Sequence, residues 1–411
     1  MTKPTLLITG GPAFASLVPA LAEQYDLLFA FPQAAQDAAN SGIQNIALLG
    51  NYMTPDAKER ADNETAIVSA RVAADLDGIG NRVTGAYRNI SMPPNLNGNL
   101  KDWFAGYALT RFHPIMLTLT ALEAAAADRQ IVGCLVHEDL TPDPRTMVLF
   151  CKTRGIPTFH LPHQTCHLLP GIEDIHRHTR ADWILASGEY MREFYISGGH
   201  PPNKIVLVGV PQWDGYYSNQ FPVRDEARRV LHLDDGLVIC YATTWAQTTS
   251  LRSEFERELQ AGLAAIIQTA KDMGATLVIK MHPNENPAGE TFYSEQMKAA
   301  GAYGLVTRQH LNYCLLASNV LMAQGPSNLC IESALLGVPP CYIQTEGFDY
   351  SHELPYRCEL DNLRETLEMT LSTRIDWNEF LHRYNDAHPN GDATIRAVEM
   401  ICNTVSVPTV S

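Results

Sequence analysis

An apolar run at 277–279 ends in Lys280, Met281, His282 and Pro283, and polar residues follow. Proline favours extended conformations in the residue before it, so the imidazole of His282 should project from the end of a strand. There it can donate a hydrogen bond to a phosphate oxygen or to a nucleoside. We assign Lys280, at the same strand end, to the same nucleotide-binding site. A turn carrying a hydrogen-bonded surface histidine explains the pattern equally well.

A second candidate site lies where the apolar run 319–323 meets a Gly-Pro turn and a helix opened by Ser327 and Asn328. Free amides and the positive end of the helix dipole make such a helix start an anion site. Glu332, about one turn into the helix, can accept both hydroxyls of a ribose. The alternative is a capping box with Ser327 as N-cap and Glu332 on the helix surface. That motif places its glutamate at the third helical position, whereas Glu332 would stand at the fifth.

Proton-transfer groups follow two earlier strands of the chain. Glu138 and Asp139 follow His137 after the run 131–136, and His163 follows the run 157–161. Carboxylates and imidazoles in such places suit general acid–base chemistry near neutral pH. The histidine spacings here match no familiar zinc ligand pattern, so we expect no metal.

Gly10 and Gly11 follow the first apolar run and predict a tight strand-to-helix turn whose backbone can approach an acceptor or a phosphate closely. The chain has no phosphate-binding loop of the NTPase type, no dinucleotide fingerprint in its strand–turn–helix context and no nucleophile elbow. These absences exclude three common enzyme classes.

Short apolar runs alternate with amphipathic stretches throughout the chain, which is typical of parallel sheets with crossover helices. We therefore predict an α/β protein with two Rossmann-like domains that face each other across a cleft. An acceptor domain should span 1–212, a nucleotide-donor domain 235–360, and helices 361–411, the last of which packs back on the first domain. The region 50–130 is poorly patterned, with helices expected near 103–117 and 119–127. Strands are expected at 5–9, 25–31, 44–49, 131–136, 157–161, 183–186, 204–208, 237–242, 276–280, 304–307, 319–323 and 340–343.

The chain has 411 residues and a formal net charge of −15, which disfavours nucleic acid as a partner. A small anionic donor remains acceptable, because backbone amides and a few basic groups can hold it. No stretch approaches the roughly 20 apolar residues of a membrane span, and the start shows no signal-peptide pattern. We expect a cytoplasmic protein whose nine cysteines are reduced.

The order of these motifs resembles the GT-B glycosyltransferase superfamily. The similarity is greatest to the branch of UDP-GlcNAc 2-epimerases, CDP-glycerol glycerophosphotransferases and capsule-type Kdo or sialic acid transferases. The segments that carry it are Gly-Ile-Pro-Thr at 155–158 with Leu-Pro-His-Gln at 161–164, and Ala-Asp-Trp-Ile-Leu-Ala-Ser at 181–187 with Val-Gly-Val-Pro-Gln-Trp-Asp at 208–214. The resemblance spans about 130–345.

The resemblance implies that His282 contacts the nucleotide, that Ser327 and Asn328 hold the phosphates and that Glu332 binds the ribose. The chain departs from the pattern in two places. His163 is followed by Gln-Thr where the group often has His-Gly, and the segment 324–332 carries a single glutamate where epimerases have a pair. The second departure counts against an epimerase.

We therefore expect a metal-independent, inverting glycosyltransferase without a cofactor, whose co-substrate is a nucleotide sugar. Glu138, Asp139 or His163 would deprotonate the hydroxyl of a glycan, lipid-linked or small-molecule acceptor. The alternatives are a sugar-nucleotide epimerase, a CDP-glycerol-type glycerophosphotransferase and a non-catalytic nucleotide-sugar-binding protein.

Overall fold

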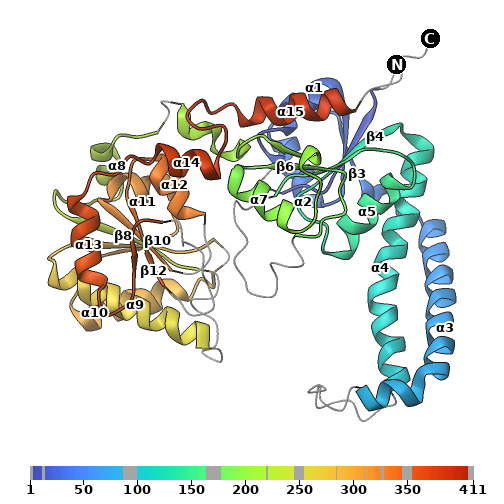
Figure 1. The fold of residues 1–411 in the computed structure, drawn as a ribbon, viewed down its shortest axis with the longest axis horizontal. Helices are drawn as coiled ribbons and strands as arrows, with labels where there is room; N and C mark the ends of the chain where they lie inside the picture. Colours follow the sequence, from blue (N-terminus) through green and yellow to red (C-terminus); the bar gives the residue numbers. More distant parts are fainter. Residues whose placement is uncertain are drawn as a thin grey trace.

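A computed structural model of the protein describes residues 3–11, 14–86, 100–162, 177–218, 221–244, 254–283, 285–309, 311–324, 328–344 and 354–405. It contains two separate, wholly parallel sheets, each in its own α/β domain (Figure 1). The predicted fold class is confirmed. The first sheet has the order β3-β2-β1-β4-β5-β6-β7. Its strands are β1 (Thr5–Ile8), β2 (Asp26–Phe29), β3 (Ile46–Leu48), β4 (Ile131–Val136), β5 (Thr158–His160), β6 (Trp183–Ala186) and β7 (Ile205–Leu207).

Both faces of the first sheet are covered, because successive strand side chains point to opposite sides. Leu6 and Ile8 pack into one core with α1 (Val18–Gln24), α2 (Pro32–Asn40) and α15 (Ala393–Thr404). Leu7 packs into the other core with α4 (Leu100–Asp128) and α5 (Pro142–Lys152). A further helix, α7 (Glu189–Ser197), packs beside β6 and β7.

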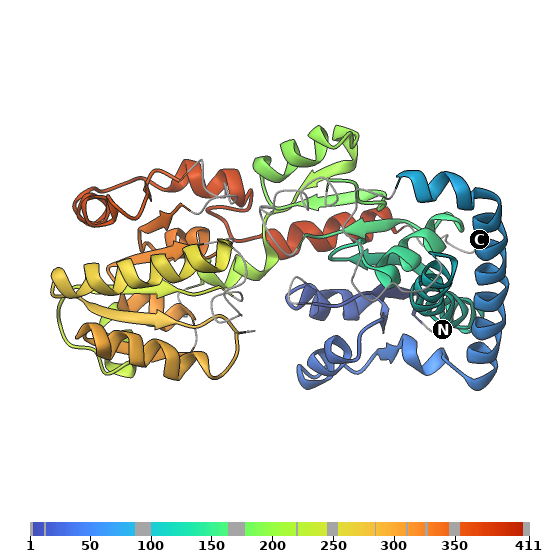
Figure 2. The ribbon, with the colours of Figure 1, turned by 90° about the horizontal axis from the view of Figure 1, so that it is seen from below.

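The region 50–130 contains two long helices, α3 (Pro55–Ala86) and α4, which lie side by side and project from the first domain (Figures 1 and 2). The helix α3 was not predicted, and the two short helices expected at 103–117 and 119–127 are one helix that runs through Pro114. Proline removes one helical hydrogen bond, but contacts with α3 hold the flanking turns. Surface ion pairs join the two helices, Arg60 with Glu123 and, at 2.8 Å, His113 with Asp62.

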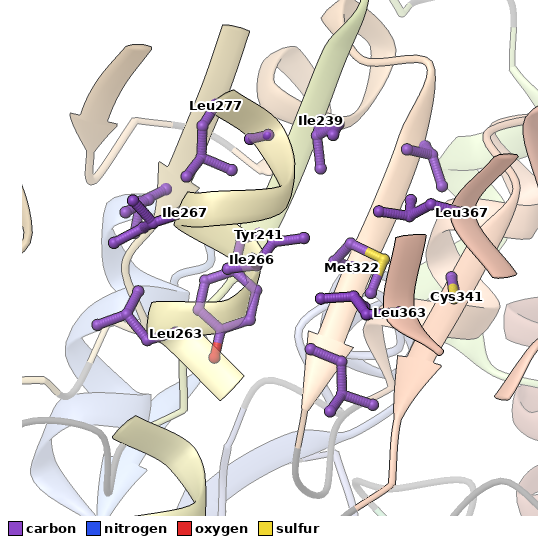
Figure 3. Close-up of a cluster of buried hydrophobic side chains, with 14 of the residues drawn as sticks. Ile239, Tyr241, Leu263, Ile266, Ile267, Leu277, Met322, Cys341, Leu363 and Leu367 are labelled. Carbon is purple, nitrogen blue, oxygen red and sulfur yellow. The ribbon is translucent and has the colours of Figure 1, made fainter. Parts of the chain in front are cut away.

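The second sheet has the order β10-β9-β8-β11-β12-β13. Its strands are β8 (Val238–Ala242), β9 (Thr276–Lys280), β10 (Gly304–Thr307), β11 (Val320–Gln324), β12 (Pro340–Ile343) and β13 (Arg357–Cys358). The last of these was not predicted. Figure 3 shows the core on one face, where Leu277 and Tyr241 meet α9 (Glu254–Asp272) and α13 (Leu363–Ser372). The other face packs on α8 (Arg224–Val230) and α11 (Leu311–Ala317).

The chain crosses between the two sheets twice. It leaves β7 through a 3₁₀ segment, η5 (Pro211–Tyr217), and returns through α14 (Asn378–Tyr384) to α15 on the first domain. The crossings are tied together, because the carboxylate of Asp214 accepts the amides of Ala393 and Thr394 at 3.0 and 2.7 Å. A carboxylate at a helix start satisfies free amides and complements the dipole. The start of α15 is thus fixed to the first crossing.

Candidate active site

In the second domain, parallel register brings the ends of β8, β9 and β11 to one edge of the sheet. Ala242 pairs with Lys280 and with Ala323, so the residues that follow these strands are neighbours. Thr243, directly after β8, donates its amide to the carbonyl of Lys280 at 3.0 Å. Its hydroxyl accepts the amide of His282 at 3.0 Å. The backbone of His282 is therefore held against the end of β8.

A buried carboxylate, Glu285, completes this turn, and its role was not predicted from the sequence. Its side chain accepts hydrogen bonds from the hydroxyls of Thr243, at 2.6 Å, and of Tyr293 in α10 (Gly289–Ala300). Arg308 donates to its carbonyl oxygen at 2.9 Å. Glu285 is only 3% exposed, and a buried carboxylate is tolerated only where hydrogen bonds satisfy it. These bonds fix the turn that carries His282.

Burial shifts the pKa of the two basic groups at this edge, Lys280 and His282. It lowers the pKa of His282, an effect that Glu285 partly offsets and Lys280 reinforces. The lowered pKa favours the neutral imidazole. Burial also lowers the pKa of Lys280, whose ammonium donates to the carbonyl of Met281 at 2.6 Å. Thus both predicted residues lie at this sheet edge, and Lys280 is already engaged by its own backbone.

The helix that follows β11 is α12 (Leu329–Leu335), and its N-cap is Asn328. The expected N-cap, Ser327, lies outside the described residues. Glu332 is consequently at the fourth helical position, and its amide donates to the carbonyl of Asn328 at 3.1 Å. Asn328 makes no side-chain capping bond. The arrangement is not a capping box, because that motif requires the glutamate at the third position.

Glu332 is not the surface residue that the capping-box alternative required. Tyr216 donates its hydroxyl to the carboxylate at 2.5 Å, and the Trp213 indole also hydrogen-bonds to it. Burial raises the pKa of Glu332 to about 7, although both hydrogen bonds lower it. Trp213 and Tyr216 belong to η5, so this carboxylate lies where the first crossing meets the second domain.

In the first domain, Gly10 and Gly11 form the turn after β1 with φ values of 91° and 119°. A Cβ on Gly10 would lie 2.2 Å from the Cβ of Ala34, so only glycine lets α2 approach this closely. A Cβ on Gly11 would lie 3.7 Å from Nδ1 of His137, which follows β4. That nitrogen is also 3.1 Å from the hydroxyl of Thr9.

These residues line a cavity of about 650 Å³ between α1 and α2. Its described walls are Gly10, Gly11, Phe14, Ala15, Val18, Pro19, Phe29, Phe31, Gln33, Ala34, Asp37, Ala38, Ser41, Ile43 and His137. Burial lowers the pKa of His137, an effect that Glu138 and the Gly10 backbone partly offset. His137 was not among the site residues selected from the sequence, and the Gly10–Gly11 turn beside it was the available signal.

The expected catalytic bases are placed differently from one another. Glu138 accepts the amides of Leu140 and Thr141 at 2.6 and 3.0 Å, and also the Thr141 hydroxyl. Burial would raise its pKa, but these bonds lower it, so it is committed to the turn before α5. Asp139 is buried and accepts the amide of Arg180 at 2.5 Å. Burial raises its pKa despite that bond. His163 lies outside the described residues.

Two further findings on the described residues concern metal ions and membranes. Among them, no group of three or more His, Cys, Asp or Glu side chains could hold a metal ion. Within the same part of the chain, no helix is both long enough and apolar enough to cross a membrane.

Comparison with known proteins gives the fold a context. A family model described as CDP-glycerol:poly(glycerophosphate) glycerophosphotransferase matches residues 160–353. No curated protein matches the chain. Among solved structures, the UDP-GlcNAc 2-epimerase of Methanocaldococcus jannaschii in complex with UDP-GlcNAc and UDP is similar, with a TM-score of 0.56 and 12% identity over 98% of this chain and 99% of that one.

Two further structures have the same fold. The UDP-GlcNAc 2-epimerase of Neisseria meningitidis, bound to UDP-GlcNAc, has a TM-score of 0.56 and 14% identity over 98% of this chain and 99% of that one. Anabaena HepE, in complex with UDP and glucose, has a TM-score of 0.53 and 11% identity over 98% and 99%. The chain therefore has a GT-B-like fold, and its resemblance to this branch of the superfamily is confirmed. The family model matches part of the chain, and the solved structures share its fold.

Proposed function

We propose that the protein is a glycosyltransferase that moves a sugar from a nucleotide-activated donor to an acceptor hydroxyl, without a metal and with inversion. The observation that carries the proposal is Glu332, a carboxylate about one turn into the helix after β11, with two hydrogen-bond donors already around it. A ribose also presents two neighbouring donors, its 2′- and 3′-hydroxyls. The two ribose hydroxyls would donate hydrogen bonds to the Glu332 carboxylate, either in place of Tyr216 and Trp213 or together with them.

The rest of the donor fits the same sheet edge. Asn328 and Ser327 precede Glu332 and would hold the phosphates, with amides at the start of α12. His282, fixed by Thr243, would donate a hydrogen bond to a phosphate oxygen, and Lys280 would add positive charge nearby. Hydrogen bonds to the departing phosphate would offset the charge that develops there.

In the first domain, a base would deprotonate the acceptor as the sugar is transferred. Of the two described candidates, Asp139 has a pKa that burial raises, which is the direction that favours proton acceptance, whereas the pKa of Glu138 is lowered. His163 remains a third candidate. Closure of the two domains would exclude water and limit donor hydrolysis.

A glycerophosphotransferase is the second candidate, because the matching family model covers the whole segment from the end of β5 past β12. It would use the same nucleotide site with an activated glycerol phosphate in place of a sugar. A non-catalytic binding protein would hold the nucleotide sugar without breaking the bond between the sugar and the nucleotide.

A thermal-shift screen against UDP, CDP, CMP, GDP and dTDP sugars, together with CDP-glycerol, tests the proposal, because a ligand that binds the native state raises the melting point. The best nucleotide should then bind Glu332→Ala ten- to a hundredfold more weakly, from the roughly 1.5–3 kcal/mol of hydrogen bonds to a charged acceptor. Equal affinities would remove Glu332 from the site. No melting shift with any nucleotide would overturn the proposal.

A further inference from the structure

The cavity between α1 and α2 opens at the point where the strand order of the first sheet reverses. The order runs β3-β2-β1 in one direction and β4-β5-β6 in the other, so β1 and β4 flank the reversal. Open α/β sheets bind ligands in the crevice outside this point. Gly10 and Gly11 follow β1, His137 follows β4, and all three line the cavity. In Figure 2 the blue helices α1 and α2 lie on the side of the first domain that is turned to the second.

The chemistry of the walls defines what the cavity can hold. The side walls are chiefly hydrocarbon, with Phe14, Phe29, Val18 and Ala34 among them. None of the fifteen described lining residues is lysine or arginine, and the single carboxylate is Asp37. A diphosphate placed here would lack a counter-charge and would lie near a like charge. The described walls therefore favour apolar surface over a charged diphosphate.

We propose that this cavity binds the acceptor, and that the acceptor is an uncharged molecule with an apolar group attached to the reacting hydroxyl. Its volume of about 650 Å³ lies within the roughly 300–1,000 Å³ of small-molecule sites. The hydrocarbon part fills the space between α1 and α2. The hydroxyl lies at the polar end, beside Gly10, Gly11 and His137.

The polar end of the cavity is lined by the turn at 10–11, whose two glycines present no side chains that could cover a bound hydroxyl. The inference rests on the proposed glycosyl transfer, since an epimerase needs no acceptor. The proposed acceptor is thereby narrowed from any hydroxyl compound to one with an attached hydrocarbon group.

Linear 1-alkanols from butanol to octanol serve as probes, because they combine a hydroxyl with a chain of variable length. Each methylene buried in the cavity should tighten binding about fourfold, from roughly 0.8 kcal/mol per CH₂. Binding is measured by ligand-observed NMR with and without the best nucleotide from the donor screen. With the nucleotide sugar present, mass spectrometry should detect the alkyl glycoside.

Two variants test whether the alkanol binds inside the cavity. Ala15 and Ser41 are exposed residues of the cavity wall, so Ala15→Trp and Ser41→Trp should each obstruct it from a different side. Ala39 is an exposed residue of α2 outside the cavity, and Ala39→Trp is the matched control. In both obstructing variants, alkanol affinity should no longer rise with chain length, and octanol should bind at least tenfold more weakly. The control should keep the dependence on chain length. All three should bind nucleotide as the unchanged protein does, which also shows that they are folded.

Affinity that does not depend on chain length, or equal octanol binding by all three variants, would overturn the inference. Failure of the proposed function looks different. The unchanged protein would then bind no nucleotide sugar, or would bind it and form no alkyl glycoside even though alkanol affinity rises with chain length.

Discussion

Replacement of Glu332 by glutamine should make the protein more stable at pH 8. The folded protein raises the pKa of this carboxyl from 4.5 to about 7 because burial disfavours its charged form. At about 1.4 kcal/mol per pKa unit, ionised Glu332 costs the folded state up to about 3.5 kcal/mol. Glutamine keeps the shape and one hydrogen-bond acceptor but carries no charge, so this cost disappears.

The sign of the pH dependence follows from the direction of the shift. The folded state binds the proton more tightly than the unfolded state does, so the cost is absent below about pH 4.5, grows up to about pH 7 and is complete above it. Glu332→Gln should therefore match the unchanged protein at pH 4.5 and exceed it by about 1–3 kcal/mol at pH 8. Denaturant titrations at four pH values between 4.5 and 8 measure this difference. A difference that is the same at every pH, or a loss of stability at pH 8, would refute the argument.

The same substitution should weaken nucleotide-sugar binding ten- to a hundredfold, since the amide is not a charged acceptor. Stability and affinity would then change in opposite directions. Glu295→Gln, an exposed substitution on α10 of the same domain, is the control and should alter neither quantity.

Further predictions concern metal independence, the catalytic base, the turn after β9 and the turn after β1. Turnover should survive EDTA, and a loss restored by magnesium or manganese would contradict metal independence. Asp139→Ala should lower turnover far more than donor binding; a rate within about threefold, roughly 0.7 kcal/mol, would exclude it as the base. Glu285→Gln should cost about 1–3 kcal/mol of stability and weaken nucleotide binding, because one hydroxyl bond at the His282 turn is lost. Gly10→Ala should destabilise more than Gly42→Ala, as measured by denaturation: both have positive φ, but a Cβ on Gly42 meets nothing within 4 Å.

The strands could be read from the sequence because buried parallel strands are continuous apolar runs. The expected bounds 131–136, 183–186, 276–280, 304–307 and 340–343 are those of β4, β6, β9, β10 and β12. β13 has only two residues, Arg357 and Cys358, too few to form a pattern. The helices α3 and α4 were misread for another reason. The region 50–130 is poorly patterned, so α3 was not predicted and a break was expected between 117 and 119, whereas α4 is continuous and packs along α3.

Local sequence predicted where the candidate site residues stand but not what surrounds them. The helix start before Glu332 was displaced by one residue, from Ser327 to Asn328. The partners of Glu332, Trp213 and Tyr216, are more than a hundred residues away in the chain, so no spacing rule connects them. The same holds at β4, where only the folded protein shows that the Glu138 carboxylate is bound to neighbouring amides.

The double crossing between the domains has a topological consequence. Because β1 and α15 both belong to the first domain, the second domain is an insertion within it. Ala397, Ile401 and Val405 of the returning segment are buried in the first core, so a truncation before α15 damages the first domain while leaving the second sheet whole. A cut in either crossing segment alone would leave the two domains joined through the other one, because Asp214 of the first crossing is hydrogen-bonded to the start of α15.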